Sequence, residues 1–139
     1  MENICDSITM DLYALGRMIR KTINKSLENK TDLSVVEMFL LISLGYESEM
    51  NIGEFLENTN FAKREISVPI QVLQERGYVK CESGDFSLTK SGRKTLIALT
   101  EMLSEIRSKL MHGVVESDKD AIKMMHNRMR HNCINMIYG

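Results

Sequence analysis

Apolar and polar residues follow one another along most of the chain with the spacing of amphipathic helices. The clearest case is residues 7–28, whose apolar positions form one stripe: Ile8, Leu12, Leu15, Ile19, Ile23 and Leu27. Steps of three and four residues place such a stripe on one face of a helix. Residues 38–44 are apolar on nearly every face. We therefore expect the helix that contains them to lie at the centre of the fold.

Short polar signals predict where the next helices begin and end. Ser34 and Glu37 have the spacing of a capping box, in which each side chain accepts a hydrogen bond from the other residue's backbone N–H. Asn51 and Glu54 repeat this spacing before a short helix that buries three apolar residues, Ile52, Phe55 and Leu56. Gly45 is expected to end the helix that starts after Ser34, because glycine commonly stops helices.

A helix, a hairpin and a second helix are expected over residues 62–95. The first helix covers about 62–76, turns three apolar residues inward and ends at Gly77; these residues are Ile66, Ile70 and Leu73. Segments 78–82 and 86–88 then flank a turn at Ser83-Gly84-Asp85, which is the pattern of a β-hairpin. Thr89 is expected to cap the helix that follows.

Two long amphipathic helices complete the chain, separated by Gly113. The first has a seven-residue repeat of apolar positions: Leu96, Leu99, Leu103, Ile106 and Leu110. The second starts near Ser117 and has Ile122, Met125, Met129, Cys133 and Met136 on one side. One small module cannot cover this much apolar helix surface. The helices over about 7–30 and 90–138 are therefore expected to pair with those of a second copy.

The order of elements predicts a mainly α fold with a small β-hairpin. We interpret it as a winged helix-turn-helix with long N- and C-terminal dimerisation helices. The length of 139 residues suits a single domain, residues 1–139, with its winged core at about 32–95. In such a core the second helix can enter the major groove of DNA, while the hairpin reaches the neighbouring backbone or minor groove.

Charge is distributed unevenly, although the formal net charge is only −1. Residues 31–60 hold six acidic and no basic residues, whereas residues 61–94 hold seven basic and four acidic residues. The basic segment coincides with the expected groove-binding helix and hairpin. This placement favours a surface that faces a polyanion.

The runs from Ile52 to Glu57, Ile66 to Leu73, Gly77 to Val79 and Leu88 to Arg93 resemble the DNA-binding core of the MarR (multiple antibiotic resistance regulator) family. The long helices on either side extend the resemblance over nearly the whole chain. The resemblance implies a homodimeric transcriptional regulator, in particular a repressor, that binds a pseudo-palindromic site in double-stranded DNA. It also implies a small aromatic or amphipathic effector.

The resemblance assigns roles to individual residues. Those expected to face bases are Lys63, Arg64, Ser67, Val68 and Gln71, and those expected to hold phosphates are Arg76, Lys80 and Lys90. A glutamine can bind adenine through two hydrogen bonds, and a valine can pack on a thymine methyl group. The residues suggested for an effector pocket are Tyr13, Arg17, Met38 and Tyr46.

Two features depart from the family pattern. The hairpin is short, carries the acidic residues Glu82 and Asp85, and lacks the arginine that relatives insert into the minor groove, so we do not expect it to read DNA there. Pro69 lies inside the groove-binding helix, where proline removes one backbone hydrogen bond at a cost of about 3 kcal/mol. We expect the helix to bend at this point.

Other classes of function find little support in the sequence. Phosphate-loop, serine-hydrolase and zinc-protease motifs are not present, so catalysis and a cofactor are not expected. His126 and Cys133 share a helix face but lack the close pairing of metal ligands, and Cys5 beside Asp6 is expected to be an inert thiol. Three scattered cysteines suit a reducing cytoplasm, and no apolar run is long enough to cross a membrane. The competing hypothesis is a winged-helix module that binds another protein through its acidic 31–60 segment or its hairpin edge.

Overall fold

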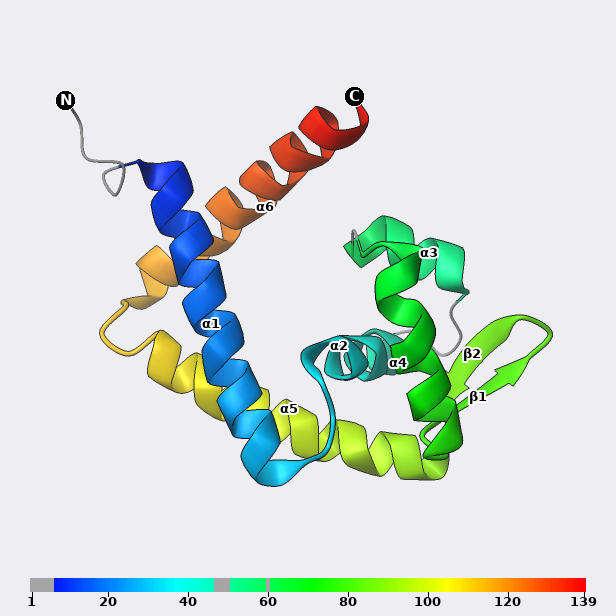
Figure 1. Cartoon of the computed structure of the whole chain (residues 1–139). Coiled ribbons are helices and arrows are strands. Elements are labelled where there is room, and N and C mark those ends of the chain that lie inside the picture. Colours follow the sequence, from blue (N-terminus) through cyan, green and yellow to red (C-terminus); the bar gives the residue numbers. More distant parts are fainter. Residues whose placement is uncertain (1–6, 47–50, 60) are drawn as a thin grey trace. The chain divides into compact units, whose positions relative to one another are not determined.

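A computed structural model describes residues 7–46, 51–59 and 61–139 of the chain. Within these residues the helices and strands are arranged along the chain as a mainly α fold with one small hairpin, which confirms the predicted fold class (Figure 1). They are α1 (Ile8–Lys30), α2 (Val35–Tyr46), α3 (Ile52–Thr59), α4 (Lys63–Glu75), β1 (Val79–Glu82), β2 (Asp85–Leu88), α5 (Lys90–Leu110) and α6 (Glu116–Tyr138).

The chain forms two compact units whose boundary falls inside α5, between Ile106 and Arg107. The first unit contains α1 to β2 and most of α5. The second contains the last turn of α5, a turn in which Gly113 has a φ of +84°, and α6. A single domain over residues 1–139 stays a prediction. No helix in the described ranges is long and apolar enough to span a bilayer.

The core of the first unit is built around α2, as its continuous apolar sequence predicts. Helix α2 packs against α1, α4 and β2. Each neighbouring element adds buried side chains to those of α2, and the resulting core consists of Leu27, Leu33, Val35, Met38, Leu40, Leu41, Leu44, Phe55, Ile66, Leu73, Val79, Leu88, Leu99 and Met102. The seven-residue stripe predicted for α5 misses Met102, which is buried, whereas Leu110 is exposed.

The predicted caps of α2 and α3 are present. Glu37 Oε2 accepts the Ser34 N–H at 2.6 Å, and Ser34 Oγ accepts the Glu37 N–H at 3.2 Å, so both halves of the capping box form. Asn51 Oδ1 accepts the Glu54 N–H at 2.8 Å at the start of α3. These hydrogen bonds satisfy backbone donors that a helix start otherwise leaves unpaired.

The expectation that Gly45 ends α2 is wrong, because the helix continues to Tyr46. Gly45 instead lies against α5, where a Cβ atom would collide with the side chain of Leu96. Its missing side chain allows α2 and α5 to approach closely. Helix α5 also approaches α1, where Lys30 Nζ lies 3.7 Å from Glu105 Oε2.

Candidate nucleic-acid interface

Helix α4 is held by its apolar face, and this determines what it presents outward. Ile66 and Leu73 are buried and Ile70 is half-buried, while the helix contacts α2 and β1 (Figure 1). The five residues predicted to face bases are all exposed on α4: Lys63, Arg64, Ser67, Val68 and Gln71. Steps of three and four residues put most of them on the side opposite the core, since a helix turns every 3.6 residues.

The first turn of α4 leaves its two cations available. Glu65 Oε1 accepts the backbone N–H of Ala62 at 3.3 Å, so this acidic side chain is engaged with the helix start, where the helix dipole favours negative charge. The side-chain cations of Lys63 and Arg64 have no hydrogen-bond or ion-pair partner among the described residues. Their charges can therefore meet an external anion without breaking an existing bond.

Two side-chain hydrogen bonds organise the outer face of α4. Ser67 Oγ donates to the carbonyl oxygen of Lys63 at 2.7 Å, and Gln71 Nε2 donates to Glu75 Oε1 at 3.3 Å. Val68, which follows Ser67 in α4, is 66% exposed. The outer face thus combines one apolar contact surface with groups that can donate and accept hydrogen bonds.

Helix α4 continues through Pro69 from Lys63 to Glu75. Pro69 has no N–H to donate to the carbonyl oxygen of Glu65, so one hydrogen bond of the regular ladder cannot form. The remaining apolar contacts, through Ile66 and Leu73, keep the helix in place. The bend expected at Pro69 stays a prediction.

The three residues predicted to hold phosphates lie around the end of α4. Arg76 follows the last residue of the helix, Lys80 is on β1, and Lys90 begins α5; all three are exposed. Thr89 Oγ1 donates to the carbonyl oxygen of Gly77 at 2.5 Å, which brings the start of α5 to the end of α4. Lys80 Nζ also lies 3.6 Å from Glu82 Oε1.

The same corner is fixed by further backbone contacts. Thr89 caps α5 as predicted, because its Oγ1 accepts the Gly92 N–H at 3.0 Å. Gly92 is buried so close to the hairpin that a Cβ atom would collide with the carbonyl oxygen of Tyr78. The end of α4, the base of the hairpin and the first turn of α5 are thereby joined.

The hairpin is tighter than predicted. Glu82 pairs with Asp85, so Asp85 belongs to β2 and the three-residue tip expected at Ser83-Gly84-Asp85 is wrong. Only Ser83 (φ 53°) and Gly84 (φ 84°) form the turn, and positive φ at both central residues is typical of a type I′ turn. Two carboxylates therefore flank the tip directly. Their charge opposes contact with phosphates, and a wing that does not read the minor groove stays a prediction.

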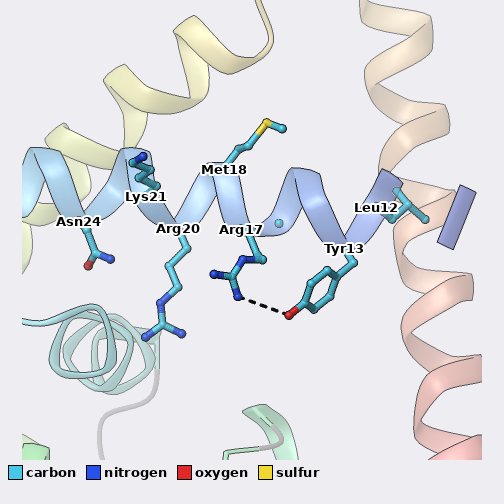
Figure 2. A pocket seen from close by; sticks show the side chains of 8 residues that line it. Leu12, Tyr13, Arg17, Met18, Arg20, Lys21 and Asn24 are labelled. Atoms are coloured by element: carbon cyan, nitrogen blue, oxygen red, sulfur yellow. Dashed lines mark hydrogen bonds between the residues drawn. The ribbon is translucent and has the colours of Figure 1, made fainter. Parts of the chain in front are cut away.

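Two of the four residues suggested for an effector pocket come together on α1. Tyr13 and Arg17 line a groove of about 880 Å³, where Arg17 Nη1 donates to Tyr13 Oη at 3.4 Å and the guanidinium lies 5.9 Å from the ring centroid (Figure 2). Arg20 and Asn24 extend to the same side of α1 in Figure 2. The other lining residues are Leu12, Gly16, Met18 and Lys21. The three- and four-residue steps from Tyr13 through Arg17 and Arg20 to Asn24 are a signal that could have identified them.

Met38 and Tyr46 do not line this groove. Met38 is 2% exposed because it lies on the inner face of α2 and packs in the core. Tyr46 is 88% exposed at the end of the same helix. Within residues 7–46, 51–59 and 61–139, no three histidine, cysteine or acidic side chains gather as metal ligands would. Cys81 and Cys133 are exposed thiols, and Cys5 lies outside the described residues.

Comparison with solved structures identifies the fold. A MarR/EmrR family transcriptional regulator from Acinetobacter sp. ADP1 superimposes with a TM-score of 0.87 at 16% sequence identity, covering 96% of this chain and 99% of that chain. BpsR of Bordetella bronchiseptica, whose DNA binding is regulated by 6-hydroxynicotinic acid, gives 0.81 at 13% identity over 94% and 97%. CouR of Rhodococcus jostii RHA1, solved with p-coumaroyl-CoA, gives 0.78 at 18% identity over 99% and 96%.

No protein-family model matches the sequence, and no curated protein sequence matches it. The predicted resemblance to MarR regulators is confirmed by the structures, since many regulators of that family share the fold over nearly their full length.

Proposed function

We propose that this protein is a MarR-type transcriptional repressor that binds double-stranded DNA as a homodimer. The observation that carries the proposal is the outer face of α4, which exposes Lys63, Arg64, Ser67, Val68 and Gln71 on the helix that the winged-helix fold offers to the major groove. The shared fold with regulators such as BpsR supports this use of the helix.

The residues that face DNA in this proposal either read bases or bind phosphates. Arg64 and Lys63, in the first turn of α4, approach base edges or phosphates, and Gln71 and Val68 contact an adenine and a thymine methyl group. Arg76, Lys80 and Lys90 bind phosphates, which fixes the position of the protein on DNA without reading its sequence. The acidic hairpin tip stays away from the minor groove.

The dimer is supported by apolar surface that the chain leaves exposed. In α1 the exposed apolar residues include Ile8 and Met18, and in α6 they include Met125, Met129 and Met136, the last of which is 78% exposed. No residue of α6 is buried within the described chain. A lone amphipathic helix with this much apolar surface gains stability by packing against a partner. Residues 7–30 and 90–138 are the proposed dimerisation helices.

The groove on α1 is the proposed effector site. Its Tyr13 ring can stack on an aromatic ligand, and Arg17 and Arg20, which extend to the same side of α1, can neutralise an anionic group on it. BpsR responds to an aromatic acid and CouR is solved with an aromatic acyl thioester, which supports a ligand of this class. A ligand that binds better to one spacing of the two α4 helices than to another shifts the population of DNA-competent dimers.

A salt titration of duplex binding tests the proposal. Fluorescence anisotropy would first be measured at low salt with fragments that include the DNA upstream of the protein's own gene. Three phosphate-binding cations in each of two protomers predict a log–log slope of about −5, since each neutralised phosphate contributes roughly −0.9. Absence of binding to every duplex at low salt would contradict the proposal.

Two variants of α4 test the assigned face. Arg64→Ala and Gln71→Ala are expected to reduce discrimination between sequences while the dimer, measured by light scattering, stays intact. Asp32→Ala is a matched control, because it removes one exposed charge from the segment between α1 and α2, outside α4 and outside the proposed dimerisation helices. Unchanged discrimination in both α4 variants would show that another surface reads the DNA.

One observation favours a second function, that of a protein-interaction module. Helix α3, which would cross the phosphate backbone, exposes Glu54 and Glu57 and has no basic residue. A module that binds a basic protein surface through α3 would bind no duplex at low salt. The salt titration therefore separates the two functions.

A further inference from the structure

Glu75 stands at the end of α4, one turn beyond Gln71, and both side chains are exposed. We propose that Glu75 fixes the orientation of the Gln71 amide, so that Gln71 accepts adenine and rejects guanine at one position of each half-site. This inference rests on the proposed function, because it concerns how α4 reads the major groove.

The hydrogen bond between the two side chains fixes the orientation of the Gln71 amide group. Gln71 Nε2 lies 3.3 Å from Glu75 Oε1. A carboxylate can only accept hydrogen bonds, so the nitrogen of the amide must face Glu75 and the oxygen must face away. One N–H of the amide group and its carbonyl oxygen remain available to a base.

This remaining pair of groups matches adenine and opposes guanine. In the major groove adenine presents the N7 acceptor and the N6 amino donor, which pair with the free N–H and with Oε1 of Gln71. Guanine presents two acceptors, N7 and O6, so the fixed Oε1 would face another acceptor. Without Glu75 the amide can rotate and offer its nitrogen to guanine.

Ser67, one turn before Gln71 on the outer face, is likewise oriented by a hydrogen bond within α4. Its hydroxyl hydrogen is used in the 2.7 Å bond to the Lys63 carbonyl oxygen, which leaves only lone pairs pointing outward. Ser67 can therefore accept from the amino group of adenine or cytosine in this conformation. Ser67 thus presents an acceptor and Gln71 one acceptor and one donor, whereas the side chains of Lys63 and Arg64 present only donors.

The experiment is a fragment selection with the full chain, followed by competitive binding of matched duplexes. The position of interest is the one whose base preference is lost in Gln71→Ala. There the wild-type protein is expected to prefer adenine over guanine by about 5- to 150-fold, the range for a two-bond base contact. Glu75→Ala is expected to lower this ratio several-fold at that position and at no other. Asp32→Asn, which removes an exposed carboxylate between α1 and α2, is the matched control and should leave the ratio unchanged.

Glu75→Gln keeps the shape of the side chain and provides a second variant should Glu75→Ala fold poorly. Its amide can donate as well as accept, so the orientation of Gln71 is no longer fixed and the ratio is again expected to fall. A wild-type protein that binds and discriminates, with variants of Glu75 that keep the adenine-to-guanine ratio, would overturn this inference and leave the proposed function standing. Failure of the wild-type protein to bind any duplex would instead overturn the proposed function.

Discussion

Replacing Thr89 with alanine should loosen the joint between α4, the hairpin and α5. The Thr89 hydroxyl makes two hydrogen bonds at once, donating to the Gly77 carbonyl at 2.5 Å and accepting the Gly92 N–H at 3.0 Å. Loss of a threonine N-cap costs about 1 kcal/mol, and loss of the second hydrogen bond costs about 1 kcal/mol more. We expect the free energy of unfolding to fall by about 2 kcal/mol, which lowers Tm by roughly 6–10 °C for a chain of this size.

Urea denaturation followed by circular dichroism measures this change. All variants would be compared at one protein concentration, because the stability of a dimer depends on concentration. Thr89→Ser keeps the hydroxyl and is the matched control, expected within about 0.5 kcal/mol of the wild-type protein. If the free energy of unfolding of Thr89→Ala falls by less than about 0.5 kcal/mol, the hydroxyl does not join α4, the hairpin and α5.

The effects of three further substitutions on stability follow from the packing of α4 and of the first turn of α5. Gly92→Ala should lower the free energy of unfolding by about 1–3 kcal/mol, measured by thermal unfolding, because the new Cβ would meet the Tyr78 carbonyl oxygen. An unchanged Tm would contradict the close approach of Gly92 to Tyr78. Leu73→Ala should lower the free energy of unfolding by about 2–5 kcal/mol in urea denaturation, since the Leu73 side chain of α4 is fully buried in the core. A loss under about 1 kcal/mol would contradict this burial. Pro69→Ala should raise the free energy of unfolding by roughly 1–3 kcal/mol, because it restores a donor for the Glu65 carbonyl, and a decrease would mean that the helix depends on the proline.

Local signals in the sequence predicted most of the fold. The capping box of Ser34 and Glu37, the stop at Gly77 and the cap at Thr89 each depend on residues only a few positions apart. The inward residues Ile66 and Leu73 follow directly from helical spacing. For the same reason the exposed face of α4 could be predicted, since it is the side opposite its apolar stripe.

Apart from the hairpin tip, what the sequence could not predict concerns contacts between residues far apart in the chain. Gly45 has the sequence of a helix stop, yet its role depends on Leu96, some fifty positions later in the chain. The burial of Met38 depends on the packing of α2 against its neighbours, and a place for Met38 in an effector pocket stays a prediction. The role proposed for Glu75 likewise needs the side-chain geometry, because spacing alone does not show which partner Gln71 chooses.

The two-residue turn of the hairpin can be lengthened without disturbing the packed base of the hairpin. The buried residues of the hairpin, Val79 and Leu88, pair at its base, far from Ser83 and Gly84 at its tip. Extra residues inserted at the tip would leave that base in register, and the entropy of closing a longer loop rises only slowly with its length. A few insertions that add an arginine could therefore give the wing a minor-groove contact without changing the core. In evolutionary terms, the length of the hairpin tip can vary while the core that holds its base stays under separate selection.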